Sequence, residues 1–439
     1  MKNLFSSAGR RWLPWILGLL LGPAPCASVV ARPAAAGTVS ISQQPGRPET
    51  PAAPRAQAGE GTWPAAPYRS EEVKIVNNLD RVELAGTLTV PGGAGPFPAV
   101  VLLSGQDAQT RDAVYNGFAL FASLADDLAR HGVAVLRFDD RGVGRSTGDS
   151  TATTAAKVRD AQAALAFLRS QSIIDVAHVG VLGHGEGGNV ALLTAAQPLP
   201  PNFVITLAAA GIPGREAMVR QRPSLLVRAG SSDSVLVRQA QRAETFRRET
   251  ARQVDKMRAL GSNAAQIDTY LEQVRLRQKV SEKKLLEAQV ARRQSMLDII
   301  ANTPDDGQAQ AIIANMIRQD TPLLDAATVR TGSVRLTSPW FRQYITFNPQ
   351  AELSKVRGSV LLLHGTADDL LDAQDNLEAL SKGLKGNARV TVQKLEGVNH
   401  LFQAPASEWP VADGGKPTPI LSPAMLETLR EWIQARARE

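Results

Sequence analysis

The chain of 439 residues contains a single cysteine, Cys26, which lies close to the N-terminus. Downstream of Cys26 there is therefore no disulfide bond, no cysteine nucleophile and no metal site built from thiolates. Histidine is also scarce, with five in the whole chain, so any role that needs an imidazole has few candidates. The apolar run Trp12–Leu21 covers about ten residues, which is too short to span a bilayer comfortably.

The N-terminus has the pattern of an export signal. Lys2 and the pair Arg10–Arg11 precede the apolar run, and small residues follow it. We expect residues 1–30 to be a signal peptide and the protein to be periplasmic or secreted; the alternative is an uncleaved N-terminal membrane anchor. Residues 31–67 are rich in Ala and Pro and nearly free of bulky apolar side chains, which predicts a disordered linker.

The basic charge of the chain is concentrated in one segment. The formal net charge is +7, and residues 215–300 alone hold 18 Lys and Arg against 10 Asp and Glu. This segment lacks interleaved aromatic residues and belongs to an exported protein, so we do not expect nucleic acid as a partner. A solvated helical surface is the simplest interpretation, and contact with an anionic membrane surface is the alternative.

Strand and helix patterns alternate after the linker. Two alternating segments near residues 70–90 predict a hairpin, and continuous apolar strands follow that are typical of a sheet covered on both faces. The predicted strands that follow the hairpin are Phe97–Gly105, Val133–Asp140, His178–Gly185 and Phe203–Gly211, with helices between them from about Gly117, Thr153 and Asn189. This order predicts an α/β fold with a mostly parallel, doubly wound sheet.

The alternation stops near Ile212 and resumes at Gly358. The intervening sequence predicts long helices, among them 234–260 and 264–301. We therefore expect a single sheet domain, with a first part over residues 68–212 and a second part over 341–439. A helical cap insertion over 213–340 interrupts it.

One turn, "VGVLGHGEGGNVALL", predicts a strand, a glycine-rich turn and a helix. Many hydrolases carry G-x-S-x-G here, with the nucleophilic serine at the tip. The tip in this chain is Gly185, so the serine is absent. Two other predicted strand ends carry a carboxylate, Asp368 or its neighbour Asp369, and then a histidine, His400, in the chain order nucleophile, acid, base.

The chain resembles the α/β-hydrolases, in particular exported carboxylesterases of the EstD type and serine-aminopeptidase-like hydrolases. The segments that carry the resemblance are "LLSGQDAQTRD", "LRFDDRGVGRSTGD", "VGVLGHGEGG", "TSPWFRQYITFNP", "LLLHGTADDLL" and "LEGVNHLFQ". The resemblance implies hydrolysis of an acyl ester through an acyl-enzyme, without cofactor or metal. It implies His400 as the general base, Asp368 as the acid that orients it, and the N–H groups of Gln106 and Glu186 as the oxyanion hole.

Gly185 is where the chain departs from this pattern. Loss of the nucleophile costs on the order of 10⁶ in kcat in serine hydrolases. Two functions follow: an ester hydrolase that is impaired or inactive, and a non-catalytic protein that binds a small ligand in the hydrolase pocket. Retention of Asp368 and His400 favours the first, and Gly185 favours the second. Trp340 and Phe341, where the cap rejoins the sheet, are candidates for lining the acyl pocket or for packing in the core.

Overall fold

The computed structural model describes residues 67–438 with the exception of 107, 221–232, 323, 412–414 and 416. The expected signal peptide and nearly all of the expected linker lie outside the described residues, so export stays a prediction. Among the helices that the structure describes, none has the length and apolarity needed to cross a membrane.

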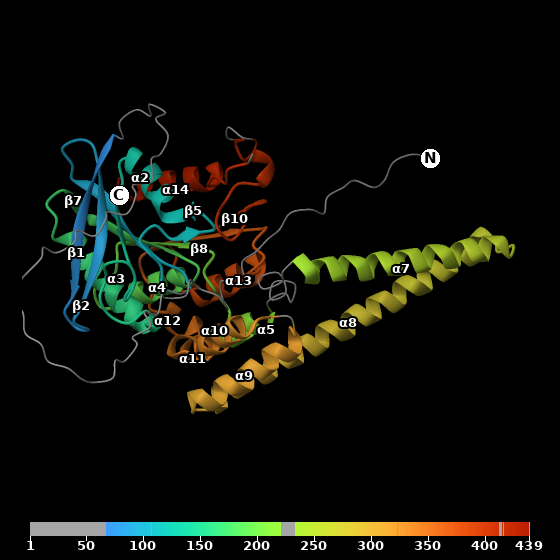
Figure 1. The fold of residues 1–439 in the computed structure, drawn as a ribbon. Coiled ribbons are helices and arrows are strands. Elements are labelled where there is room, and N and C mark those ends of the chain that lie inside the picture. The colour runs from blue at the N-terminus through green and yellow to red at the C-terminus, as the bar shows by residue number, and fades with distance from the viewer. Residues whose placement is uncertain are drawn as a thin grey trace, which may run out of the picture. The chain divides into compact units, whose positions relative to one another are not determined.

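The described residues form an eight-stranded sheet (Figure 1), with the order β1-β2-β6-β3-β7-β8-β9-β10. The pairs β1–β2 and β2–β6 are antiparallel, and the remaining pairs are parallel. This confirms the predicted mostly parallel sheet. The bounds are Tyr68–Asn77 for β1, Val82–Pro91 for β2, Phe97–Leu103 for β3, Ala134–Phe138 for β6, Ile174–His184 for β7, Phe203–Leu207 for β8, Ser359–Gly365 for β9 and Val390–Leu395 for β10.

Helices cover both faces of this sheet (Figure 1), and side chains alternate between two cores. In β3, Val101 packs into the core beneath one set of helices, and its neighbours Val100 and Leu102 pack into the other. One face carries α3 (Thr154–Arg169), α4 (Glu186–Ala195) and α13 (Ala373–Gly383); the other carries α2 (Leu120–Arg130) and α14 (Pro423–Arg436). Strands buried on both faces explain the continuous apolar runs in the sequence.

The helix expected from Gly117 begins three residues later, at Leu120. A short hairpin, β4 (Val114–Tyr115) and β5 (Phe118–Ala119), precedes it. Its turn residues Asn116 and Gly117 have φ angles of +49° and +82°, which a right-handed helix does not accept. Asparagine and glycine tolerate this conformation best, so local turn chemistry prevails over the helical pattern.

A run of helices separates β8 from β9 in the chain. They are α5 (Gly214–Arg220), α7 (Asp233–Ala259), α8 (Ala264–Asn302), α9 (Asp306–Asp320), α10 (Ala326–Leu336) and α11 (Pro339–Thr346), followed by the short α12 (Gln350–Leu353). A reciprocal capping box between Asn263 and Gln266 starts α8. Their apolar side chains form a third core that contains Ile300, Ile313 and Trp340.

The chain enters and leaves this helical segment at adjacent points. The N–H of Gly214 donates to the carbonyl of Phe347 at 3.0 Å, and α5 contacts α11. A segment with its own core and closely spaced ends can be deleted without unfolding the sheet. The division of the chain at residues 213 and 340 stays a prediction.

Replacement of residues 214–337 by a short Gly-Ser bridge tests this division. We expect the remaining chain to keep the far-UV circular dichroism of an α/β protein and to unfold cooperatively on heating, because both cores on the sheet stay complete. Failure of the shortened chain to fold, together with independent folding of the isolated segment 214–337, would contradict a single interrupted domain.

Candidate active site

Gly185 forms the tip of a sharp turn between β7, which ends at His184, and α4, which begins at Glu186. Its φ and ψ angles are +56° and −119°, a conformation that side chains rarely adopt. The flanking glycines are required for close packing: a Cβ on Gly183 would overlap the carbonyl of Gly187, and a Cβ on Gly187 would overlap the carbonyl of Leu103. Strand and helix therefore hold the tip in place by direct backbone contact.

The loops after β9 and β10 bring Asp368 and His400 together. His400 Nδ1 lies 2.7 Å from Asp368 Oδ2. The other carboxylate oxygen accepts the backbone N–H groups of Leu370 at 2.8 Å and Leu371 at 2.9 Å. The side chain of Asp368 is fully buried, and that of His400 is 13% exposed. The carboxylate is thus fixed on one side and orients the imidazole on the other.

Each member of this pair shifts the pKa of the other. Burial alone would raise the pKa of Asp368, but the charges and hydrogen bonds of His400 and His364 hold it well below its usual range. Burial alone would lower the pKa of His400, but Asp368 outweighs it, aided by Asp369, and raises that pKa above its ordinary value. The pair therefore favours an anionic Asp368 beside a readily protonated His400.

The free nitrogen of His400 faces the tip of the turn. A Cβ built on Gly185 would lie 3.7 Å from His400 Nε2 and 3.8 Å from the Cα of Gly105. A seryl oxygen, one bond further out, would fall within hydrogen-bond reach of Nε2, about 2.6–3.2 Å. The structure thus brings Gly185, Asp368 and His400 together, with no side chain at the position that faces His400 Nε2; their catalytic roles stay a prediction.

Two further histidines surround this pair. His184 Nε2 donates to the carbonyl of His400 at 2.9 Å, and burial, together with the nearby His400, lowers the pKa of His184 to about 3. His364 Nε2 lies 3.0 Å from Asp368 Oδ2 and 3.0 Å from the carbonyl of Leu371, so it carries the proton and donates to both. The sequence analysis missed His364, whose only signal was its four-residue spacing from Asp368.

The two expected oxyanion donors flank the tip. Glu186 is the first residue of α4, and its N–H has no carbonyl to bond within the helix. Gln106 follows Gly105, whose Cα is among the nearest atoms to the tip. Their role as donors stays a prediction.

Trp340 and Phe341 are both buried, and they pack in the core of the helical insertion. Trp340 Nε1 also donates to both oxygens of the Glu186 carboxylate at 3.0 Å. Trp340 thereby connects α11 directly to the first residue of α4. A role of Trp340 and Phe341 in lining an acyl pocket stays a prediction.

A cluster of buried charged side chains that was not predicted from the sequence contacts Gly105 and Glu186. Lys157 of α3 donates to the carbonyl of Gly105 at 2.8 Å and lies 3.5 Å from Glu186 Oε2 and 3.9 Å from Asp140 Oδ2. Asp140 also accepts from Ser104 Oγ at 2.5 Å, and burial raises the pKa of Asp140 although Lys157 opposes the shift.

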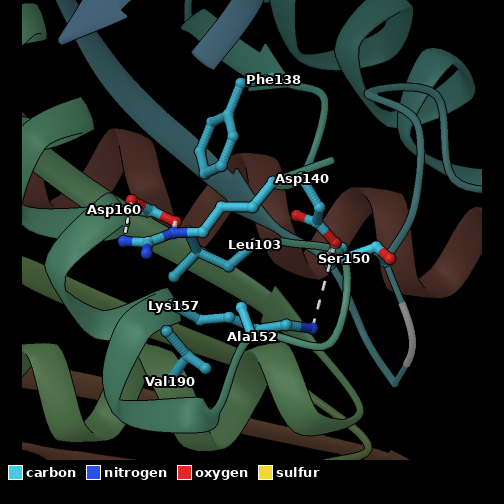
Figure 2. A pocket seen from close by; sticks show the side chains of 11 residues that line it. Leu103, Phe138, Asp140, Ser150, Ala152, Lys157, Asp160 and Val190 are labelled. Carbon is cyan, nitrogen blue, oxygen red and sulfur yellow. Dashed lines mark hydrogen bonds and ion pairs between the residues drawn. The ribbon is translucent and has the colours of Figure 1, made fainter. Parts of the chain in front are cut away.

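Figure 2 shows Asp140 and Lys157 at a cavity of about 20 Å³, lined also by Leu103 and Val190. That volume holds about one water molecule. Gly185 and His400 are not among the described residues that line this cavity, so it is separate from the triad.

Comparisons with known proteins identify the family of the chain. The family model described as serine aminopeptidase, S33, matches residues 117–403, which is more than half of the chain and includes the turn, Asp368 and His400. The chain belongs to this hydrolase family and has the α/β-hydrolase fold.

Esterase EstD of Thermotoga maritima is 34% identical over 141 residues, which cover 31% of this chain and 33% of that protein. An uncharacterised protein of Mycobacterium tuberculosis is 29% identical over 183 residues, which cover 37% of this chain and 62% of that protein. The chain thus spans less than two thirds of the length of these relatives. Among solved structures, an esterase of Pyrococcus furiosus is 13% identical, with a TM-score of 0.46 over 84% of this chain and 91% of that one.

The buried His184 predicts a pH dependence of stability. The unfolded chain binds a proton at this histidine near its ordinary pKa of 6.5, whereas the folded protein does so only near 3. The free energy of unfolding therefore falls as the pH drops from 6.5 toward 3. The variant His184→Gln keeps an N–H donor for the carbonyl of His400 but cannot titrate. In urea unfolding at pH 7 and pH 5, wild type should lose more stability than His184→Gln; equal losses would contradict a neutral, buried His184.

Proposed function

We propose that this protein binds an acyl ester, or a related small molecule, in a carboxylesterase-type site whose hydrolytic activity is impaired or lost. The observation that supports the proposal most directly is the position of Gly185, 3.7 Å from His400 Nε2 when measured from a built Cβ. The acid–base pair is assembled around the place of a nucleophile that the chain does not supply. No cofactor or metal takes part in this proposal.

The remaining groups account for weak catalysis at most. Binding and oxyanion donors alone leave roughly 10³–10⁴ over the uncatalysed rate in serine hydrolases without a nucleophile. In this proposal His400, whose Nδ1 lies 2.7 Å from Asp368 Oδ2, takes a proton from a water molecule at the position of the absent seryl oxygen. That water would attack the ester carbonyl directly, without an acyl-enzyme.

Non-catalytic binding of a ligand with a carboxylate is the second candidate function. It is favoured by the raised pKa of His400, which promotes a cationic imidazole facing the tip. The N-terminus of the ten-residue helix α4 adds a favourable field for an anion at the same place. Glycine at the tip also relieves the strain that a serine would carry, so the fold does not depend on the nucleophile.

We also propose that the protein acts outside the cytoplasm and that the basic helices α7 and α8 contact an anionic membrane surface. On α8, Leu276 and Val280 are each 53% exposed and lie on the side that also carries Lys279 and Lys283. Basic side chains around exposed apolar ones suit an interface with anionic lipid. The protein should co-sediment with anionic vesicles at low salt and be released by salt; equal sedimentation with neutral vesicles would contradict an electrostatic contact.

The substitution Gly185→Ser tests the main proposal. A serine at the tip would place its hydroxyl beside His400 Nε2, and hydrolysis of short-chain p-nitrophenyl esters should rise at least 10²-fold, a modest part of the ~10⁶ that a nucleophile supplies. The free energy of unfolding should fall by about 1–3 kcal/mol, because serine must adopt the backbone conformation that glycine adopts freely.

Two controls accompany this variant. Addition of His400→Ala to Gly185→Ser should abolish the gain, because the serine then has no base. A fluorophosphonate should label Gly185→Ser at residue 185 and leave wild type unlabelled there. A Gly185→Ser protein that folds but gains no esterase activity would reject the esterase site in favour of the binding function.

A further inference from the structure

We propose that Lys157 is a positioning residue that holds both oxyanion donors in place. Its ammonium group contacts the peptide of one donor and the side chain of the other. The inference rests on the proposed function only in assigning the N–H groups of Gln106 and Glu186 to an oxyanion.

The first contact fixes the direction of the Gln106 N–H. The carbonyl of Gly105 and the N–H of Gln106 belong to one planar peptide group, and in a trans peptide they point in opposite directions. Lys157 Nζ donates to that carbonyl oxygen at 2.8 Å. The N–H of Gln106 must therefore point away from the ammonium group. The positive charge of the ammonium group beside this oxygen also polarises the peptide and makes its N–H a stronger donor.

The second contact fixes the start of α4. The side chain of Glu186 is 2% exposed, and its carboxylate lies 3.5 Å from Lys157 Nζ. Thr154 Oγ1 at 2.6 Å and Trp340 Nε1 at 3.0 Å complete its hydrogen bonds. Because the same residue supplies the second N–H donor, anchoring its side chain restricts the movement of that donor.

The burial of Lys157 argues that the cation acts on the loop. Its side chain is 12% exposed, and buried charges are costly unless they are paired. Glu186 and Asp140 supply negative charge on one side, while the shortest of these contacts is the one to an uncharged backbone carbonyl. A lysine that only neutralised the buried carboxylates would not need to donate to that carbonyl. The ammonium group thus contacts the Gly105–Gln106 peptide in addition to the two carboxylates.

Amide nitrogen shifts test the contact without any need for enzymatic activity. In the otherwise wild-type chain labelled with ¹⁵N-glutamine, the variants Lys157→Met, Glu186→Gln and the double variant are compared with Lys355→Met. Lys355 is a matched surface lysine whose side chain is 60% exposed and bonds Glu352. We expect the Gln106 amide resonance to shift in both variants that lack Lys157. It should not shift in Lys355→Met and should shift only slightly in Glu186→Gln.

Kinetics in the Gly185→Ser background test the consequence. Loss of Lys157 should lower kcat about tenfold, less than the 10²–10³-fold loss that follows removal of an oxyanion donor, with KM changed by less than about twofold. The double variant removes one positive and one negative charge and so leaves the net charge of the buried cluster unchanged; it can be measured should Lys157→Met alone fail to fold. Lys355→Met should keep the kcat of Gly185→Ser.

The outcomes separate this inference from the proposed function. A folded double variant whose Gln106 amide does not move would overturn the role of Lys157, as would a rise in KM with kcat unchanged. If Gly185→Ser gains no activity while the Gln106 amide shifts as expected, the contact stands and the esterase function fails.

Discussion

The close approach of β7 to α4 at Gly185 is the constraint on which the rest of the site depends. The backbone of Gly183 touches that of Gly187, and Gly187 in turn touches Leu103 of the neighbouring strand β3. This contact fixes the tip with a φ of +56° beside His400. In a working serine hydrolase the same constraint imposes strain on the nucleophile, about 1–3 kcal/mol. Glycine removes that strain, so the nucleophile can be lost without damage to the fold.

Hydrogen bonds that stabilise the fold explain why Asp368 and His400 are present although residue 185 is a glycine. Asp368 accepts two backbone N–H groups and contacts two histidines, and the carbonyl of His400 accepts from His184. Removal of a partner from such a buried cluster is strongly destabilising, by about 3–5 kcal/mol. Retention of Asp368 and His400 is therefore expected from stability alone and does not demonstrate catalysis. The decision between enzyme and binding protein depends on chemistry at residue 185.

The sequence predicts the repeating parts of this fold well. Parallel strands buried on both faces, the long helices α7 and α8 and the position of Gly185 follow from apolar patterns and local motifs. Contacts between residues far apart in the chain do not follow from such patterns. Lys157 and Gly105 are 52 positions apart, and no periodicity in the sequence indicates which carbonyl a lysine side chain contacts. His364 is hidden in the same way, because a strand pattern does not show that its ring turns toward Asp368. The short hairpin before α2 was missed because turn residues interrupt a helical pattern.

The central claim is that the site lacks one atom group of an esterase, the seryl hydroxymethyl, and keeps the others. Intact-protein mass spectrometry after brief exposure of Gly185→Ser to a short-chain p-nitrophenyl ester tests it most directly, because it detects the covalent intermediate itself. The account predicts one added acyl group, located on the peptide that contains residue 185, and none there in wild type. A folded Gly185→Ser protein that forms no acyl adduct and shows no turnover would contradict it.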